Sequence, residues 1–288
     1  MSKKFSLISQ TIAALAATAS LFLTAAPVRA IATIPWPWVS LSGGDLIKLP
    51  DDGNPATVVD TAVYYFGADG LRYVFPNSKT YFTWYSDFRG VKVVHAEQLG
   101  SIGIGGNVTY RPGSRMIKID SDPKVYLIDH WGTKRWLASE AAAIALYGND
   151  WNKKVDDVPD SFFSNYREGA PVNDSTQFSL TTVFNANATI GQDKELTTPV
   201  EVTVNQDGTF SPADVSVVIN HTVRWTNSTN RYVRVASNPH PTHDQLPGFD
   251  SANVAPGLNY VYKFKKSGAW AYHNHADPSL QGTVSVTQ

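Results

Sequence analysis

The chain has 288 residues, with 24 Lys and Arg against 25 Asp and Glu, so its formal charge of −1 gives no electrostatic reason to expect nucleic acid or an anionic membrane as a partner. It contains no cysteine, which excludes disulfides, thiolate nucleophiles and every metal site that needs a thiolate ligand. With 12% aromatic and 17% charged residues, the composition is that of a globular protein rich in β-forming residues.

Residues 1–30 have the features of a secretory signal peptide. Lys3 and Lys4 precede an Ala-rich apolar stretch over 12–26, and small residues stand near 28–30, where a signal peptidase reads the chain. Thr and Ser interrupt the stretch, and no later segment approaches the about 20 apolar residues that span a bilayer. We therefore expect an exported protein, secreted, periplasmic or on the cell surface. After cleavage it has no transmembrane span and begins with a stiff leader at 31–43.

The middle of the chain contains the same pattern twice. Ile47-Lys48 recurs as Ile117-Lys118, and Arg72-Tyr73 recurs as Arg135-Trp136. Several later apolar positions recur at an offset of 64, namely Val91, Val94, Leu99 and Val108 as Val155, Val158, Phe163 and Val172. This internal repeat predicts two tandem α+β units, at 44–112 and 113–174.

Each unit is expected to begin with a β-hairpin and to continue with a helix. Strands at 62–66 and 71–74 flank Gly70, and strands at 125–128 and 134–137 flank Gly132. The helix is clearest at 140–147, where Ser139 can cap its start and Gly148 can end it.

The two units carry no catalytic constellation. They contain no paired carboxylates at catalytic spacing, no Gly-rich phosphate loop and no nucleophile with a base. Their aromatic residues are best explained as core and cross-strand pairs, although some could stack on sugars. The units resemble tandem aromatic repeats of exported bacterial envelope proteins, which implies a polymer or a protein of the cell envelope as a partner. The segment 175–196, rich in Asn, Asp, Ser, Thr and Ala, is predicted to be a linker.

The C-terminal region, 197–288, shows only strand signals. Seven short strands are predicted at 200–204, 215–219, 223–226, 232–235, 260–264, 269–272 and 282–286, with no helix between them. This pattern predicts a small antiparallel β-sandwich, so the whole chain is expected to be mainly β.

The same region resembles a cupredoxin domain. The motifs that carry the resemblance are Val223-Arg-Trp-Thr, Tyr260-x-Tyr-x-Phe264 and Gly268-x-Trp270-x-Tyr272-His273. The resemblance implies a Greek-key sandwich that holds copper through two His, one Cys and one Met. This chain has other residues at those four positions: Val233, Asn274, Asp277 and Leu280. Without the thiolate, a blue copper centre cannot form.

Four histidines replace that ligand set. His240 and His243 lie in a loop stiffened by Pro239 and Pro241, and His273 and His275 alternate at a strand end, where residues two apart face the same way. Imidazole ligands suit copper, here expected as Cu²⁺, with zinc as an alternative. Asp244, Asp250 and Asp277 are candidates for supporting contacts, and Asp277 has the best claim of the three because it occupies a ligand position of the family pattern.

These observations predict an exported metal-binding protein that captures or transfers copper. They favour a binding protein and leave an enzymatic activity open. One alternative is an extracellular or periplasmic electron-transfer protein or small copper redox protein. Another is a metal-free adhesive or structural protein of the envelope, in which the sandwich is only a module.

Overall fold

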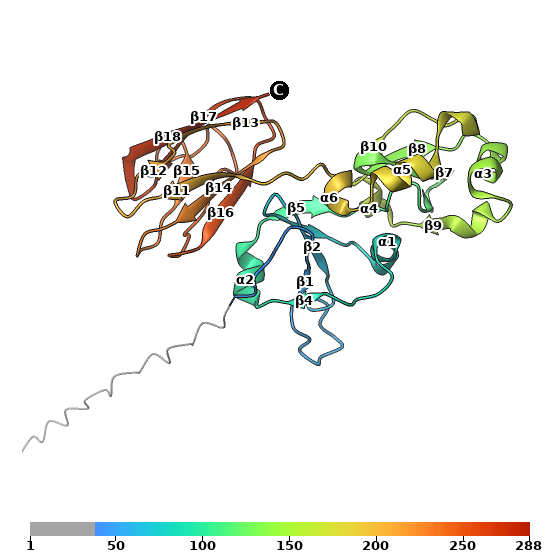
Figure 1. The fold of residues 1–288 in the computed structure, drawn as a ribbon, viewed down its shortest axis with the longest axis horizontal. Coiled ribbons are helices and arrows are strands. Elements are labelled where there is room, and N and C mark those ends of the chain that lie inside the picture. The colour runs from blue at the N-terminus through green and yellow to red at the C-terminus, as the bar shows by residue number, and fades with distance from the viewer. Residues whose placement is uncertain (1–37) are drawn as a thin grey trace, which may run out of the picture. The chain divides into compact units, whose positions relative to one another are not determined.

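The computed structural model describes residues 38–288, and most of their regular structure is β-strand (Figure 1). The predicted signal peptide and most of the predicted leader lie outside the described residues. Among residues 38–288, none of the helices is long and apolar enough to cross a membrane.

Two five-stranded sheets make up the region from Leu46 to Glu168. The first has the order β4-β1-β2-β3-β5, and its strands are β1 (Leu46–Lys48), β2 (Tyr64–Phe66), β3 (Arg72–Val74), β4 (Lys92–Val93) and β5 (Ile104–Asn107). The second has the order β9-β6-β7-β8-β10, and its strands are β6 (Met116–Ile119), β7 (Asp122–Asp129), β8 (Thr133–Trp136), β9 (Val155–Asp157) and β10 (Arg167–Glu168).

The two sheets have equivalent pairings. In each sheet the three central strands are joined by antiparallel pairing, β1-β2-β3 in the first and β6-β7-β8 in the second. The outer strands pair in parallel, β4 and β5 in the first sheet and β9 and β10 in the second. Two of these outer strands, β4 and β10, are only two residues long. Two copies of one α+β unit would have this equivalence.

Short helices connect the strands of the two sheets. They are α1 (Ser78–Trp84), α2 (Ala96–Ser101), α3 (Glu140–Tyr147) and α4 (Asp160–Phe163), with 3₁₀ turns η1 (His130–Gly132) and η2 (Trp151–Lys154). The predicted helix at 140–147 is confirmed. The Ser139 hydroxyl accepts a hydrogen bond from the Ala142 N–H at 3.2 Å, and Gly148 ends the helix with a φ of 86°.

The segment 175–196 is helical and partly buried, in contrast to the predicted linker. It contains η3 (Ser175–Gln177), α5 (Leu180–Ala186) and α6 (Ile190–Asp193). Phe178 and Val183 are buried in the same core as residues of β6 and β7. Its polar residues serve as helix caps: Ser179 accepts from the Thr182 N–H, and Thr189 forms a capping box with Gln192. The polar composition suggested a linker, but a few buried apolar side chains such as Phe178 and Val183 are enough to hold such short helices in place.

The remaining strands form two four-stranded sheets, coloured orange to red in Figure 1. One sheet has the order β12-β11-β14-β16, with β11 (Val200–Val204), β12 (Phe210–Ser211), β14 (Thr222–Asn227) and β16 (Asn259–Lys263). The other has the order β13-β18-β17-β15, with β13 (Asp214–Val218), β15 (Val235–Ser237), β17 (Gly268–Asn274) and β18 (Asp277–Thr287). Side chains of both sheets bury one shared core around Trp225, which is 1% exposed.

The prediction that this sandwich is antiparallel is wrong for two strand pairs. β11 pairs with β14 in parallel, and β13 pairs with β18 in parallel. Between β11 and β14 the chain crosses to the other sheet to form β13, so it returns to the first sheet in the same direction. Both sheets are therefore mixed.

Candidate metal centre

The four predicted histidines come from two segments that meet at one end of the β13-β18-β17-β15 sheet. His240 and His243 lie in the loop after β15, whereas His273 is in β17 and His275 follows it. β15 and β17 pair with Ala236 opposite His273. The Asn238 N–H donates to the Ala271 carbonyl at 3.0 Å, and the His275 N–H donates to the Arg234 carbonyl at 2.9 Å. Backbone hydrogen bonds therefore fix both segments against each other.

The loop holds His243 in an unusual conformation. Its φ is 54°, in the left-handed region that costs a residue other than glycine roughly 1 kcal/mol. The His243 N–H donates to the Pro239 carbonyl at 2.8 Å, and the fully buried Ser237 hydroxyl donates to the His243 carbonyl at 2.8 Å. These bonds turn the ring toward the other histidines.

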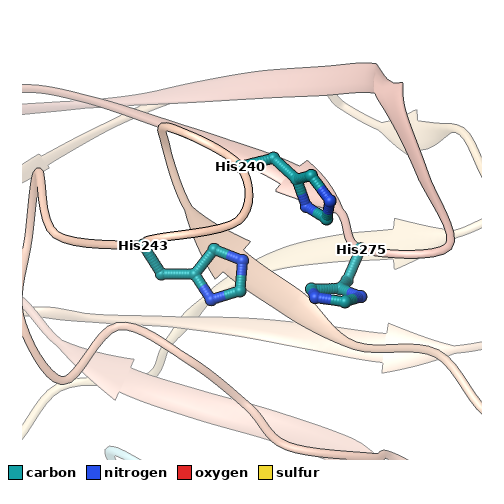
Figure 2. Close-up of side chains that lie close together, drawn as sticks. All are labelled: His240, His243 and His275. Atoms are coloured by element: carbon teal, nitrogen blue, oxygen red, sulfur yellow. The ribbon is translucent and has the colours of Figure 1, made fainter.

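The four imidazole rings form one cluster. Ring nitrogens of His240, His243 and His275 all lie within 4.8 Å of one another (Figure 2). The ring centroid of His273 is 5.2 Å from that of His243, 5.4 Å from that of His240 and 6.3 Å from that of His275. Metal–nitrogen bonds of about 2.0 Å place ligand nitrogens roughly 3–4 Å apart. Small ring movements would bring the three closest nitrogens to that separation.

The cluster has a closed side and an open side. His273 is fully buried and the His243 side chain is 8% exposed, whereas His240 is exposed. An ion in the cluster would thus be reached from solvent past His240.

Both buried histidines place the Nδ1 atom close to a side-chain oxygen and leave the Nε2 atom free. The Nδ1 of His273 is 2.7 Å from the Asn238 Oδ1, and the Nδ1 of His243 is 3.3 Å from the Asp250 Oδ2. Within residues 38–288, the buried Nε2 atom of each ring has no hydrogen-bond partner. A buried polar atom without a partner is costly, and a metal ion would satisfy it.

The electrostatics favour the neutral forms of His273 and His275. Burial, followed by the neighbouring His243 and His240, lowers the pKa of His273 to about 4. Desolvation and the Arg234 guanidinium also lower the pKa of His275. Hydrogen bonds from Arg234 lower the pKa of Asp250 to about 2, so this carboxylate stays ionised. Neutral imidazole is the form that binds metals.

Asp250, rather than the favoured Asp277, is the carboxylate that contacts the cluster. Asp277 accepts hydrogen bonds from the Ser279 N–H and hydroxyl instead, and Asp244 is exposed. Of the other positions at which the resemblance expects ligands, Val233 is buried in the core and Asn274 donates to the Gly208 carbonyl at 3.1 Å. Asp250 is one of the three candidates from the sequence, but no local signal ranks it above Asp277, because the contact depends on the path of the loop.

A second group of acidic side chains lies in the loop after β1. Carboxylate oxygens of Asp51, Asp52 and Asp60 lie within 4.8 Å of one another. These carboxylates accept hydrogen bonds from the loop itself, including the Asp52 N–H to Asp60 at 3.0 Å and the Gly53 N–H to Asp51 at 2.8 Å. The turns of the loop account for the cluster.

No family model matches the chain, and no curated protein does. Among solved structures, the chain is similar to a purple cupredoxin from Nitrosopumilus maritimus, with 19% identity and a TM-score of 0.27 over 31% of this chain and 99% of that one. It is also similar to the Cu(I) form of a mutant amicyanin, with 18% identity and a TM-score of 0.27 over 31% and 82%. A Cu-containing nitrite reductase from Thermus scotoductus SA-01 matches at 19% identity and a TM-score of 0.26 over 31% and 22%. Scores of this size assign neither a family nor a function.

Proposed function

We propose that this is an exported copper-binding protein in which His240, His243, His273 and His275 hold the ion. The observation that carries the proposal is the convergence of four rings in which two buried Nε2 atoms have no partner among the described residues. For nitrogen ligands, Cu²⁺ has a higher intrinsic affinity than zinc, which is the second candidate. When bound, copper would supply a Lewis-acidic, redox-active centre.

Capture or transfer of copper fits this ligand set better than electron transfer does. Residues 197–288 contain neither Cys nor Met, so they lack the thiolate and thioether of a fast electron-transfer site. The exposed His240 leaves one side of the cluster accessible, as delivery or release of an ion requires. Electron transfer or a small copper redox activity is therefore the less favoured function.

The proposal also covers the rest of the chain. Residues 1–30 direct export, the duplicated units at 44–112 and 113–174 attach the protein to an envelope polymer or protein, and the Greek-key sandwich at 197–288 binds the metal. The equivalent strand order of the two five-stranded sheets supports the duplication.

The test is a titration of the metal-free protein with Cu²⁺ and with Zn²⁺, followed by electron paramagnetic resonance of the copper form. We expect one tightly bound copper per chain, a wide parallel hyperfine splitting with nitrogen couplings, and no intense absorption in the red. Protons compete for imidazole, so affinity should fall as the pH falls below neutral. Absence of stoichiometric metal would favour the structural role. Tighter binding of Zn²⁺ than of Cu²⁺ would identify zinc, and not copper, as the metal that the site binds.

A further inference from the structure

A chain of hydrogen bonds runs from His273 to a backbone carbonyl. The Gln281 side-chain N–H donates to the Pro278 carbonyl at 2.9 Å, which can only accept, so the other atom of the Gln281 amide is its acceptor oxygen. That oxygen receives the Asn238 side-chain N–H at 3.3 Å. The Asn238 oxygen is then left to accept from the His273 Nδ1 at 2.7 Å. Gln281 also lies directly opposite His273 in the β17–β18 pairing.

A second chain of polar contacts runs from His243 through Asp250 to Arg234. The Asp250 carboxylate accepts from the Nε and the Nη2 of Arg234 and from the Ala252 N–H. The His243 Nδ1 lies 3.3 Å from the Oδ2 of this carboxylate, which is an electrostatic contact. Because a carboxylate paired with a guanidinium is an acceptor only, this contact favours the proton on the Nδ1 of His243.

We propose that these two relays, Pro278–Gln281–Asn238 and Arg234–Asp250, hold His273 and His243 as Nδ1–H tautomers and so reserve both Nε2 lone pairs for a metal ion. Asn238, Gln281 and Asp250 are positioning residues, because they act through the histidines and not on the ion. The inference rests on the proposed function for the identity of the ligand, but the tautomers are a property of the metal-free protein.

The relays explain why both Nε2 atoms lack partners. Which nitrogen of an imidazole carries the proton is set by the hydrogen bond of the other nitrogen. Each relay ends on a group that cannot reverse its role, a peptide carbonyl in one case and a guanidinium in the other. Both rings are therefore fixed in orientation and protonation before a metal arrives, which lowers the cost of ordering them on binding.

The first experiment reads the tautomers directly, by long-range ¹H–¹⁵N correlation of the histidine rings in the metal-free protein at pH 8. We expect the Nδ1–H pattern for His243 and His273. An Nε2–H pattern, or rapid exchange between both tautomers, at either ring would overturn the relay to that ring.

The second experiment measures copper affinity in variants of the relays. Gln281→Met keeps the size of an exposed side chain but removes both of its hydrogen bonds, and Asp250→Asn removes the ionised acceptor. We expect each to weaken copper binding by roughly 10–100-fold and to release the tautomer of its histidine. Gln281→Glu retains an acceptor for Asn238 and should restore most of the affinity. Asp277→Asn, at the start of the same strand as Gln281, is the matched control, because among residues 38–288 its carboxylate bonds to Ser279 alone.

The outcomes separate this inference from the proposed function. Wild-type affinity in both Gln281→Met and Asp250→Asn would overturn the relays even if copper binds. The expected tautomers without any binding of copper or zinc would overturn the proposed function and the positioning role with it. The hydrogen-bond assignment of the two rings would then stand as structure alone.

Discussion

His243 combines a left-handed backbone with a nearly buried ring, and its neighbours in the loop enforce both. Its contacts reach Pro239 and Ser237 through the backbone and Asp250 through the ring. His275 is fixed differently, by its peptide N–H on the Arg234 carbonyl. His243 and His275 are thus placed by contacts that do not depend on a metal ion.

Removing a ring of the cluster should weaken copper binding more than removing a distant one. We expect His243→Ala and His275→Ala each to lower the affinity by at least about 100-fold, because each deletes a ligand from a set that folding has arranged. His221→Ala, in the turn after β13, is the control and should bind as the wild type does. Competition against a chromophoric chelator measures all three, and equal affinity of His275→Ala and His221→Ala would contradict the assignment.

Asp193 should make stability depend on pH. Burial raises its pKa, one oxygen accepts from the Trp131 N–H at 2.9 Å, and the other has no partner in the described part of the chain. A raised pKa in the folded state means that stability is fully present below the ordinary pKa near 3.8 and falls as the pH rises through the folded pKa. Asp193→Asn should therefore raise the thermal midpoint by a few degrees at pH 7.

That gain in the thermal midpoint should narrow as the pH is lowered into the range where the native Asp193 carboxyl takes up a proton. Asp120→Asn, at a side chain that is 92% exposed, serves as the control and should leave the thermal midpoint unchanged both at pH 7 and at the lower pH. A gain that stays constant across the pH range would show that ionisation of Asp193 is not its source. Thermal denaturation followed by circular dichroism is sufficient.

At the scale of elements, α3 shows how much a local signal determines. Its start, its end and its cap all come from residues adjacent in sequence, namely Ser139 before it and Gly148 after it. Ser139→Ala leaves the Ala142 N–H without its acceptor, which costs about 1 kcal/mol. We expect a fall of roughly 2–4 °C in the thermal midpoint, with the surface variant Ser86→Ala unchanged.

Local patterns predicted the elements but not how they pair. The two hairpins around Gly70 and Gly132 follow from alternation and turn residues, and the structure contains them. Six of the seven strands predicted for the sandwich match strands of the structure, whereas the one predicted at 232–235 shares only Val235 with β15. Parallel pairing of β11 with β14 is a contact between distant segments, which alternation cannot report. The same holds for the site. The spacing in sequence predicted that His273 and His275 lie close together, whereas Asp250 and Gln281 come close to the histidines only through the tertiary fold.

At the scale of the whole molecule, the sandwich contains its own core. Every buried member of the cluster around Trp225 lies between Val202 and Val286. A fragment of residues 197–288 should therefore fold alone, unfold cooperatively and bind copper with an affinity within a few-fold of that of the full chain. Circular dichroism and the same metal titration test this prediction. A fragment that is unfolded while the full chain folds would place the boundary elsewhere.

The two-residue strands β4 and β10 have a consequence for behaviour at high concentration. A long exposed edge strand presents a row of free peptide groups, on which another chain can template a further strand and start a fibre. β4 and β10 close one border of each five-stranded sheet with a stretch too short for such templating. At high concentration, sheets of neighbouring molecules should therefore not pair edge to edge along these borders.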